Sequence, residues 1–511
     1  MPSPSLLITN AVIANCSGYA LPYRALLIRD GLIAQLFTDG EPKVRKVEQR
    51  LDARGHLLLP SFCDSHTHFS EYGLRLLQLD LSGLSHSDAL RCIRQHVAEM
   101  PKGSWIVGGG WTKQAFGTFP TPKELDNIST EHFIALRSAD WHSAWCNTPV
   151  LAQLNATDFS AEELPRAEDG TFTSVAFERA AKAAMALVKT LPAERQAAIL
   201  RAQAAFFKLG ITETLSMENA DALSDYQALG SQLKLRVRIG IYLESLDAAK
   251  KFYATTPHHN TELEAVKLFL DGSLGSETCS MLEPFENSRS TGMDFYADAD
   301  LVALFRLIER EHLAISVHAI GDKAVRRALN AFERLANSSS LSFQLAHRIE
   351  HAQTVHTSDL PRFARLGVIA SMQPIHIRSD IEPAMRLLGA RAERLYRFRS
   401  LLSAGTTLLF GSDAPVESPN VLEGLFYAVA RQDATGRTWY AEERLSLPQA
   451  LEAYTLSSRR IIDARRGLIE QGYQADLIVL SENIFRIPAE RLPSVQVLAT
   501  ILGGEIVHSI L

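Results

Sequence analysis

Two histidines separated by a single residue stand just after an apolar segment. His66 and His68 lie in residues 64–68, and the apolar run at residues 57–60 precedes them. Side chains of an extended strand repeat every two residues, so the two imidazoles leave the same face. Two neutral imidazoles that project together from a strand end can hold one divalent metal ion. Taken alone the pair is a weak signal, because many such pairs are ordinary surface or core histidines.

Three further residues that could ligate a metal, two histidines and one aspartate, lie at the ends of later apolar segments. His318 closes the segment 315–318, His351 closes the segment 348–351, and Asp413 follows residues 408–412. A carboxylate directly after so apolar a segment needs a partner. Each histidine, taken singly, is more often a hydrogen-bonded structural residue. Because all of them appear in order at the ends of successive predicted strands, together they predict a metal-binding site.

Lys267 is another candidate ligand, and its chemistry is less direct. It lies in the apolar segment 265–271, where burial of an ammonium group is costly unless the group loses its proton or finds a partner. A protonated lysine cannot ligate a metal, but a neutral one can react with carbon dioxide to give a carbamate, whose two oxygens could bridge two ions. The alternative is a lysine paired with an acid such as Asp271 or Glu213. The sequence leaves both interpretations open.

The elements that must position these residues alternate between strands and helices. Residues 193–209, for example, are apolar at helical spacing and stop at Gly210. Eight strands with helical crossovers match a closed (β/α)8 barrel, or TIM barrel, an α/β fold in which catalytic groups converge at the C-terminal ends of the strands. The predicted strands end near His68 and then comprise residues 211–215, 235–242, 265–271, 313–318, 344–351, 368–373 and 407–413.

The two ends of the chain differ from its middle. Residues 6–59 and 475–507 show short alternating strands and turns, such as the hairpin signal Asp30-Gly31. We therefore expect a small composite β-sandwich built from both termini, residues 1–59 and 464–511, around a barrel at residues 60–463. Roughly 140 residues separate the first two barrel strands, far more than a crossover needs. This insertion, at about residues 70–200, is expected to cover the site as a lid, because loops after barrel strands lie on the active face.

Composition excludes several classes of function. Hydrophobic residues make up 46% and charged residues 22%, and the net charge is −6 without a basic stripe, so neither nucleic acid nor an anionic membrane is an expected partner. No apolar run reaches the roughly 18 residues that span a bilayer. The N-terminus lacks the pattern of a signal peptide and the five cysteines are scattered, which favours the cytoplasm. The oligomeric state stays open, with a homodimer among the assemblies considered.

Six segments fall in a characteristic order along the chain. They are LPSFCDSHTH at residues 59–68, VKLFLDGSLGS at residues 266–276, VHAIGD at residues 317–322, RIEHAQ at residues 348–353, SMQP at residues 371–374 and FGSDAPVE at residues 410–417. Through them the chain resembles the amidohydrolase superfamily, in particular its amidohydrolase-3 branch of YtcJ-like metal-dependent hydrolases. The resemblance covers nearly the whole chain, including residues 472–480.

The resemblance implies a (β/α)8 barrel with a composite β-sandwich, and a site for one or two divalent ions, with zinc the expected metal and Lys267 carboxylated. The chain departs from the family at Ser61 and Cys63, where Gly and Ile are usual, and at Glu277, where Arg is usual. The last change removes a positive charge near the site, so a substrate inferred from the family alone is less certain. The implied ligands are His66, His68, Lys267, His318, His351 and Asp413.

The chemistry that the resemblance implies is hydrolysis. A bound metal lowers the pKa of water from about 15.7 toward 7, so that hydroxide can attack a carbonyl carbon. Asp413 would accept the proton of the water and later deliver it to the leaving nitrogen. We therefore expect a hydrolase of non-peptide carbon–nitrogen bonds in a small molecule, such as an N-substituted amide or formamide. The alternatives are a deaminase of a cyclic amidine, and a metal-binding barrel that has lost catalysis and acts through partners.

Two residues of the insertion are candidates for contacts with the substrate. His142 either donates a hydrogen bond to the developing oxyanion, as a catalytic group, or is an ordinary histidine of the lid. Trp111 follows three glycines and either lines the substrate pocket or packs in a core. The sequence does not choose between these roles.

Overall fold

The computed structural model describes residues 5–138, 143–188, 190–255, 260–286, 288–337, 345–433, 435–460 and 465–511. Contacts divide the chain into two units. The first unit comprises Met1–Tyr72 with Ile199–Leu511, and the second comprises Gly73–Ala198.

Eight parallel strands of the first unit form one sheet, in which each strand pairs with the next one along the chain. Backbone hydrogen bonds close this sheet into a barrel: Asp413 donates its N–H to the carbonyl of His66 at 2.7 Å, and His68 donates to the carbonyl of Ala414 at 2.8 Å. The predicted eight-stranded barrel is therefore confirmed. Its strands are β7 (Phe62–Thr67), β13 (Ile211–Glu218), β14 (Arg236–Tyr242), β15 (Thr261–Phe269), β16 (Ala314–Ala319), β17 (Arg348–His351), β18 (Ile369–Met372) and β19 (Leu408–Phe410).

Side chains alternate between the two faces of each barrel strand, so apolar and polar residues point in opposite directions. In β16, Ile315 and Val317 belong to the large apolar core of the unit, whereas Ser316 and His318 leave the opposite face of the strand. The apolar face packs against α10 (Asp298–Arg310) and α11 (Asp322–Ala336), which both contact β16. The same strand therefore supports the barrel with one set of side chains and supplies polar groups to its interior with the other.

The bounds of the barrel strands differ from the predicted ones: the strand predicted at residues 265–271, for example, runs from Thr261 to Phe269. The strand predicted at residues 344–351 begins at Arg348, and residue 344 lies outside the described residues. The strand predicted at residues 407–413 ends at Phe410. Asp413 cannot continue it because its backbone lies in the left-handed region, with φ of 61°.

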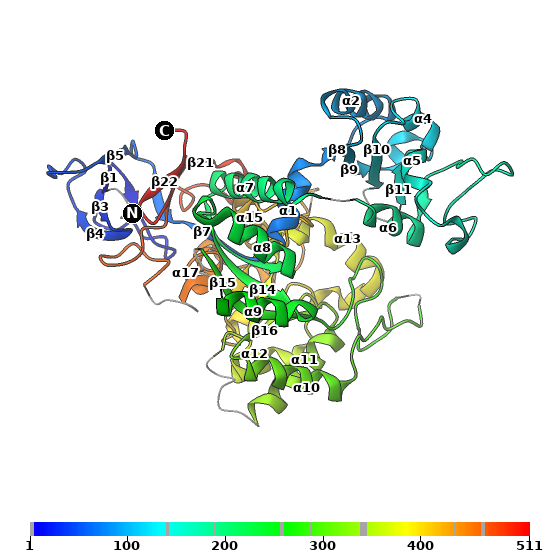
Figure 1. Cartoon of the computed structure of the whole chain (residues 1–511). Coiled ribbons are helices and arrows are strands. Elements are labelled where there is room, and N and C mark those ends of the chain that lie inside the picture. Colours follow the sequence, from blue (N-terminus) through cyan, green and yellow to red (C-terminus); the bar gives the residue numbers. More distant parts are fainter. Residues whose placement is uncertain are drawn as a thin grey trace. The chain divides into compact units, whose positions relative to one another are not determined.

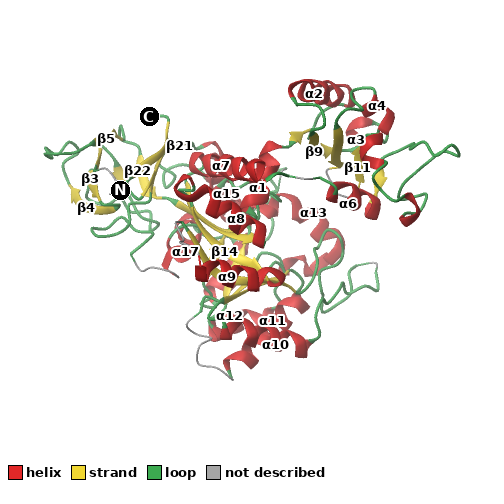
Figure 2. Cartoon of the chain, viewed as in Figure 1, coloured by secondary structure: helices red, strands yellow, loops and turns green. Residues whose placement is uncertain are grey.

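Helices surround the barrel strands, as the red ribbons around the yellow ones show in Figure 2. In the chain segment after β13, α8, α9, α10, α11 and α12 lie around the sheet (Figure 1). The described helices that lie wholly or partly in the first unit are α1 (Phe69–Leu77), α7 (Pro192–Lys208), α8 (Ala220–Leu229), α9 (Leu246–Thr255), α10 (Asp298–Arg310), α11 (Asp322–Ala336), α12 (Leu360–Leu366), α13 (Ile377–Leu388), α14 (Phe398–Ser403), α15 (Val421–Ala430), α16 (Leu447–Ala453) and α17 (Leu456–Arg460).

Both termini build a pair of sheets, as the sequence predicts. The first sheet has the order β4-β3-β1-β5 and is entirely N-terminal, whereas the second, β2-β6-β20-β21-β22, combines the two ends of the chain. Leu58 of β6 pairs with Val479 of β20, and both belong to one apolar core together with Ile8 and Ile28 of the first sheet. The strands are β1 (Leu6–Thr9), β2 (Val12–Ile13), β3 (Ala25–Arg29), β4 (Leu32–Phe37), β5 (Gln49–Asp52), β6 (Leu57–Pro60), β20 (Leu477–Leu480), β21 (Val497–Leu502) and β22 (Glu505–Ser509).

The second unit, which is the predicted insertion, has a five-stranded mixed sheet and apolar cores of its own. Its strands are β8 (Leu79–Asp80), β9 (Trp105–Trp111), β10 (Phe133–Ser138), β11 (Ser143–Cys146) and β12 (Ala176–Phe177), and its helices are α2 (His86–Glu99), α3 (Lys113–Phe116), α4 (Pro122–Asp126), α5 (Thr148–Leu151) and α6 (Glu178–Ala186). That this unit acts as a lid stays a prediction.

None of the helices in the described ranges combines the length and the apolar character that a bilayer crossing requires.

His347 gives the barrel a pH-dependent stability. The residue is buried, its Nδ1 accepts the N–H of Ile315 at 3.0 Å, and burial lowers its pKa from 6.5 to about 4. The unfolded chain therefore binds more protons below pH 6.5, and stability falls as the pH drops from 6.5 toward 4. At pH 5 this amounts to about 2 kcal/mol of unfolding free energy.

We expect His347→Gln, which retains an acceptor for Ile315, to reduce the difference in unfolding free energy between pH 7.5 and pH 5.0. The measurement is urea unfolding of the metal-free protein at both pH values, compared with the unmodified chain. An equal pH dependence in the two proteins would contradict the assignment.

Candidate metal centre

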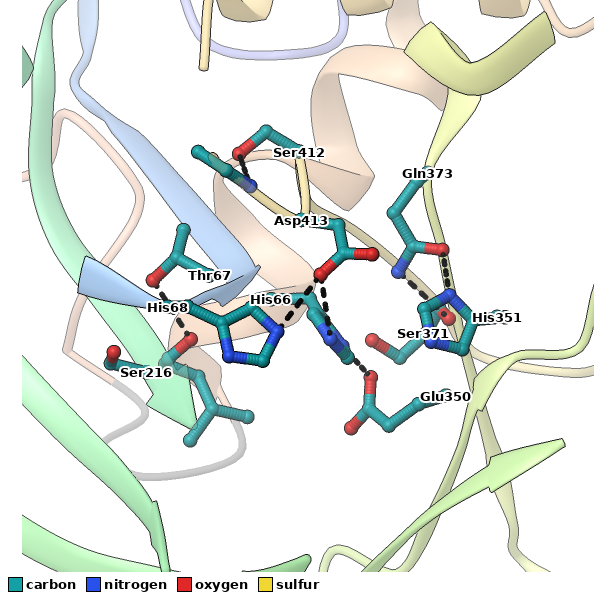
Figure 3. A network of polar contacts seen from close by, with 12 residues as sticks. His66, Thr67, His68, Ser216, Glu350, His351, Ser371, Gln373, Ser412 and Asp413 are labelled. Atoms are coloured by element: carbon teal, nitrogen blue, oxygen red, sulfur yellow. Dashed lines mark hydrogen bonds and ion pairs between the residues drawn. The ribbon is translucent and has the colours of Figure 1, made fainter. Parts of the chain in front are cut away.

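The two histidines at the end of β7 lie beside one carboxylate from the loop that follows β19, the last strand of the barrel. Every residue of β7 is buried, and His66 is completely inaccessible to solvent. The Nε2 atoms of His66 and His68 lie 3.4 Å and 3.1 Å from Oδ1 of Asp413. Figure 3 shows the carboxylate directed at both imidazoles, with Thr67 turned away from them. The predicted histidine pair and the predicted acid are therefore brought together.

The backbone of Asp413 explains how its carboxylate reaches this position. The bond from its N–H to the carbonyl of His66 holds the loop after β19 against the end of β7. Its left-handed φ of 61° turns the side chain inward, and aspartate adopts this conformation more readily than most residues. Asp64 strengthens the same junction, because its carboxylate accepts the N–H and the hydroxyl of Ser412 at 3.0 Å and 2.6 Å.

The three ligand atoms form a group that a cation could occupy. Among the described residues, His66, His68 and Asp413 each offer an atom within 4.8 Å of the other two. Nε2 of His66 is buried and has no hydrogen-bond partner among the described residues, since Asp413 lies outside hydrogen-bond geometry. A buried nitrogen lone pair beside a carboxylate needs a proton or a metal ion between them. The donor set therefore fits a divalent cation.

His318 and His351 extend this group of rings. The ring centre of His351 lies 4.9 Å from that of His66 and 4.5 Å from that of His318. Nδ1 of His351 contacts Oε1 of Gln373 at 2.9 Å, and Nε2 of His318 contacts the carbonyl of Gly272 at 3.0 Å. One nitrogen of each ring is thus occupied by an outer partner, which leaves the other available as a ligand.

The outer nitrogens of the first pair are occupied as well. Nδ1 of His66 lies 2.6 Å from Oε2 of Glu350, and Nδ1 of His68 lies 3.0 Å from the hydroxyl of Tyr242. Partners of this kind fix the orientation and tautomer of metal-binding histidines. Sequence reasoning missed Glu350, Tyr242 and Gln373 as partners. The signal for Glu350 was present, because it is an acid within a short buried strand, directly before His351.

Lys267 is buried on β15 and pairs with neither Asp271 nor Glu213, the two acids that the sequence suggested. It forms no ion pair in the described part of the chain. Asp271 instead accepts backbone N–H groups, among them that of Gly321 at 2.8 Å, and Glu213 pairs with Arg238 at 3.0 Å. Burial lowers the pKa of Lys267, although the nearby acids of the site oppose the shift. A lowered pKa favours the neutral amine, the form that can react with carbon dioxide.

Burial also prepares the histidines for ligation. It lowers the pKa of His318 to about 3 and that of His351 well below 6.5, so both are neutral at pH 7, as a ligand must be. Burial alone would raise the pKa of Asp413, but His66 and His68 hold it well below its ordinary value. For His66, burial and Lys267 lower the pKa, but the charges of Glu350 and Asp413 outweigh them and raise it.

Of the two residues predicted to contact the substrate, only Trp111 lies among the described residues. Trp111 is buried in the second unit, where its indole N–H donates to the carbonyl of Leu136 at 2.8 Å and its ring packs against Phe116. These contacts belong to the core of that unit, and a role of Trp111 in a substrate pocket stays a prediction. His142 lies outside the described residues, so its role also stays a prediction.

The histidine pair provides a direct test of the metal site. We expect the double variant His66→Ala/His68→Ala to bind no stoichiometric divalent metal, because two of the three clustered ligand atoms are removed. Elemental analysis of purified protein measures this, and circular dichroism reports whether the fold persists. His508→Ala, in β22 of the sandwich, is the control and should retain the metal. Normal metal content in the double variant would refute the site.

Comparisons with known proteins agree with this geometry. Residues 49–508 match the model of the amidohydrolase family. A putative amidohydrolase, YtcJ of Bacillus subtilis, is 28% identical over 486 residues, 90% of each chain, and an N-substituted formamide deformylase of Arthrobacter pascens is 24% identical over 98% of this chain and 97% of its own. An uncharacterised metal-dependent hydrolase of Pyrococcus horikoshii has a similar structure, with a TM-score of 0.80, 26% identity and coverage of 95% of this chain and 99% of its own. The resemblance seen in the six segments is confirmed: the chain belongs to the amidohydrolase family.

Proposed function

We propose that this chain is a metal-dependent hydrolase of a non-peptide carbon–nitrogen bond in a small molecule, such as an N-substituted amide or formamide. The observation that carries the proposal is the Asp413 carboxylate shared by the Nε2 atoms of His66 and His68. A divalent cation, zinc for this set of nitrogen and oxygen donors, would supply Lewis acidity and a water molecule of lowered pKa.

Asp413 is suited to move the proton in this reaction. Its lowered pKa keeps it ionised at neutral pH, so it can accept a proton from water as the carbon–oxygen bond forms. The same proton then passes to the leaving nitrogen as the carbon–nitrogen bond breaks. The balance is one amide and one water consumed, and one carboxylic acid and one amine released. A carboxylate held in place by a backbone bond to His66 stays oriented through both transfers.

Lys267 is proposed to carry a carboxyl group in the active protein. Its neutral amine would attack carbon dioxide and lose a proton, which gives a carbamate with two oxygen ligands. Two observations support this: the side chain is buried with a lowered pKa, and neither Asp271 nor Glu213 forms an ion pair with it in the described structure.

The substrate class is tested with a panel of small molecules and the zinc-loaded protein. The panel contains N-substituted formamides, N-acetylated amines and a cyclic amidine; formamides come first because the Arthrobacter pascens relative is named for them. We expect release of a carboxylic acid together with an amine, measured by chromatography. The double variant His66→Ala/His68→Ala controls for a contaminating hydrolase.

Other products would overturn the proposed substrate class. Ammonia released from the cyclic amidine alone would identify a deaminase. Full zinc loading without turnover of any member of the panel would favour a barrel that acts through partners.

Lys267→Ala tests the carbamate. We expect the variant to lose activity, because it cannot form the carbamate that would hold the metal, and to regain part of it when acetate or propionate is added at millimolar concentration. Turnover of the best substrate is measured with and without the acid, and metal content is measured in parallel. Normal metal content without any rescue would contradict a bridging carbamate.

A further inference from the structure

Glu350 is a carboxylate without solvent access in the interior of the barrel, on β17 directly before His351. Both of its oxygens are used. Oε2 lies 2.6 Å from Nδ1 of His66, and Oε1 accepts the hydroxyl of Ser316 at 2.6 Å. Figure 3 shows the carboxylate on one side of His66 and Asp413 on the other. The imidazole of His66 therefore lies between two acids, one on β17 and one in the loop after β19.

The arrangement determines which nitrogen of His66 carries hydrogen. An ionised carboxylate only accepts hydrogen bonds, so the 2.6 Å contact requires hydrogen on Nδ1. In the neutral ring the lone pair is then on Nε2, the atom that faces Asp413 and has no hydrogen-bond partner among the described residues. Ser316 holds the carboxylate from its other side and keeps it from rotating away.

His66 differs in this respect from the other histidines of the site. The outer nitrogen of His68 meets a phenol, and that of His351 meets an amide. His318 has a carboxylate near its outer nitrogen, but at 3.5 Å, farther than the carbonyl that this nitrogen contacts. The close carboxylate makes Nε2 of His66 the most basic of these ligand atoms.

We propose that Glu350 is a positioning residue that holds His66 with the lone pair of Nε2 toward the cation and thereby sets the affinity of the site for a divalent metal. The inference rests on the metal site of the proposed function and is independent of its substrate. Residues that orient a metal ligand in this way typically contribute 10- to 100-fold to metal affinity.

The test compares metal binding by the full-length, metal-free protein and its Glu350→Gln variant. Glutamine has the same size, but its amide can present hydrogens to Nδ1 and so allow the wrong tautomer. We expect the affinity for Zn²⁺, measured in competition with a chelator, to fall 10- to 100-fold. We also expect the visible absorption of the Co²⁺-loaded protein to change, because the geometry of one ligand changes.

A matched control separates this role from general damage to a buried acid. Glu443, in η7 (Ala441–Glu443), is also buried and accepts the N–H of Ser400 at 2.9 Å as well as the hydroxyl of that residue. Glu443→Gln should therefore leave both the Zn²⁺ affinity and the Co²⁺ spectrum unchanged. A loss of Zn²⁺ affinity in this control equal to that of Glu350→Gln would overturn the positioning role.

The remaining outcomes are also decisive. Unchanged Zn²⁺ affinity and Co²⁺ absorption in a folded Glu350→Gln protein would refute the positioning role while the metal site stands. If Glu350→Gln does not fold, Glu350→Asp replaces it: the shorter acid keeps its charge but cannot reach Nδ1, so affinity should fall, and an unchanged value would refute the inference. Failure of the unmodified protein to bind Zn²⁺ would refute the metal site itself, and the inference with it.

Discussion

Closure of the barrel between its first and last strands is the constraint on which the rest of this structure depends. Asp64 and Ser412 are 348 residues apart in the chain, yet the carboxylate of Asp64 accepts both the N–H and the hydroxyl of Ser412. Close to this contact, the N–H of Asp413 donates to the carbonyl of His66. The bond that completes the cylinder is therefore also the bond that brings the acid to the imidazoles. Loss of this junction would separate the ligands as well as open the barrel.

Burial then decides the protonation states within the site. The surroundings that exclude water from His318 and Lys267 also lower their pKa values, which favours forms without charge. Asp413 remains ionised in the same surroundings because the imidazoles of His66 and His68 lie close to it. Neutral nitrogen donors beside one anionic oxygen are the combination that a borderline-soft cation such as zinc prefers. The donor set of the site therefore fits the divalent cation of the proposed function.

Several features of the molecule could be predicted from the sequence, and the features that could not be predicted have physical reasons. The eight strands and the paired terminal sheets follow from local patterns of apolar residues, and the candidate ligands His66, His318 and His351 follow from positions at strand ends. Strand ends were less accurate: Asp413 lies beyond β19 because its φ is positive, and a pattern of residue types does not encode a dihedral angle. Glu350 was missed because its partner, His66, lies 284 residues away in the chain.

The sequence by itself determined which chemical groups are present and at which strand ends they stand, because side-chain type and local periodicity are properties of neighbouring residues. Only the tertiary structure decided which nitrogen of each imidazole faces inward, that Lys267 has neither Asp271 nor Glu213 as an ion-pair partner, and that Trp111 packs in the core of the second unit. Those outcomes depend on contacts between segments far apart in the chain, and such contacts are set when the barrel closes and water is excluded.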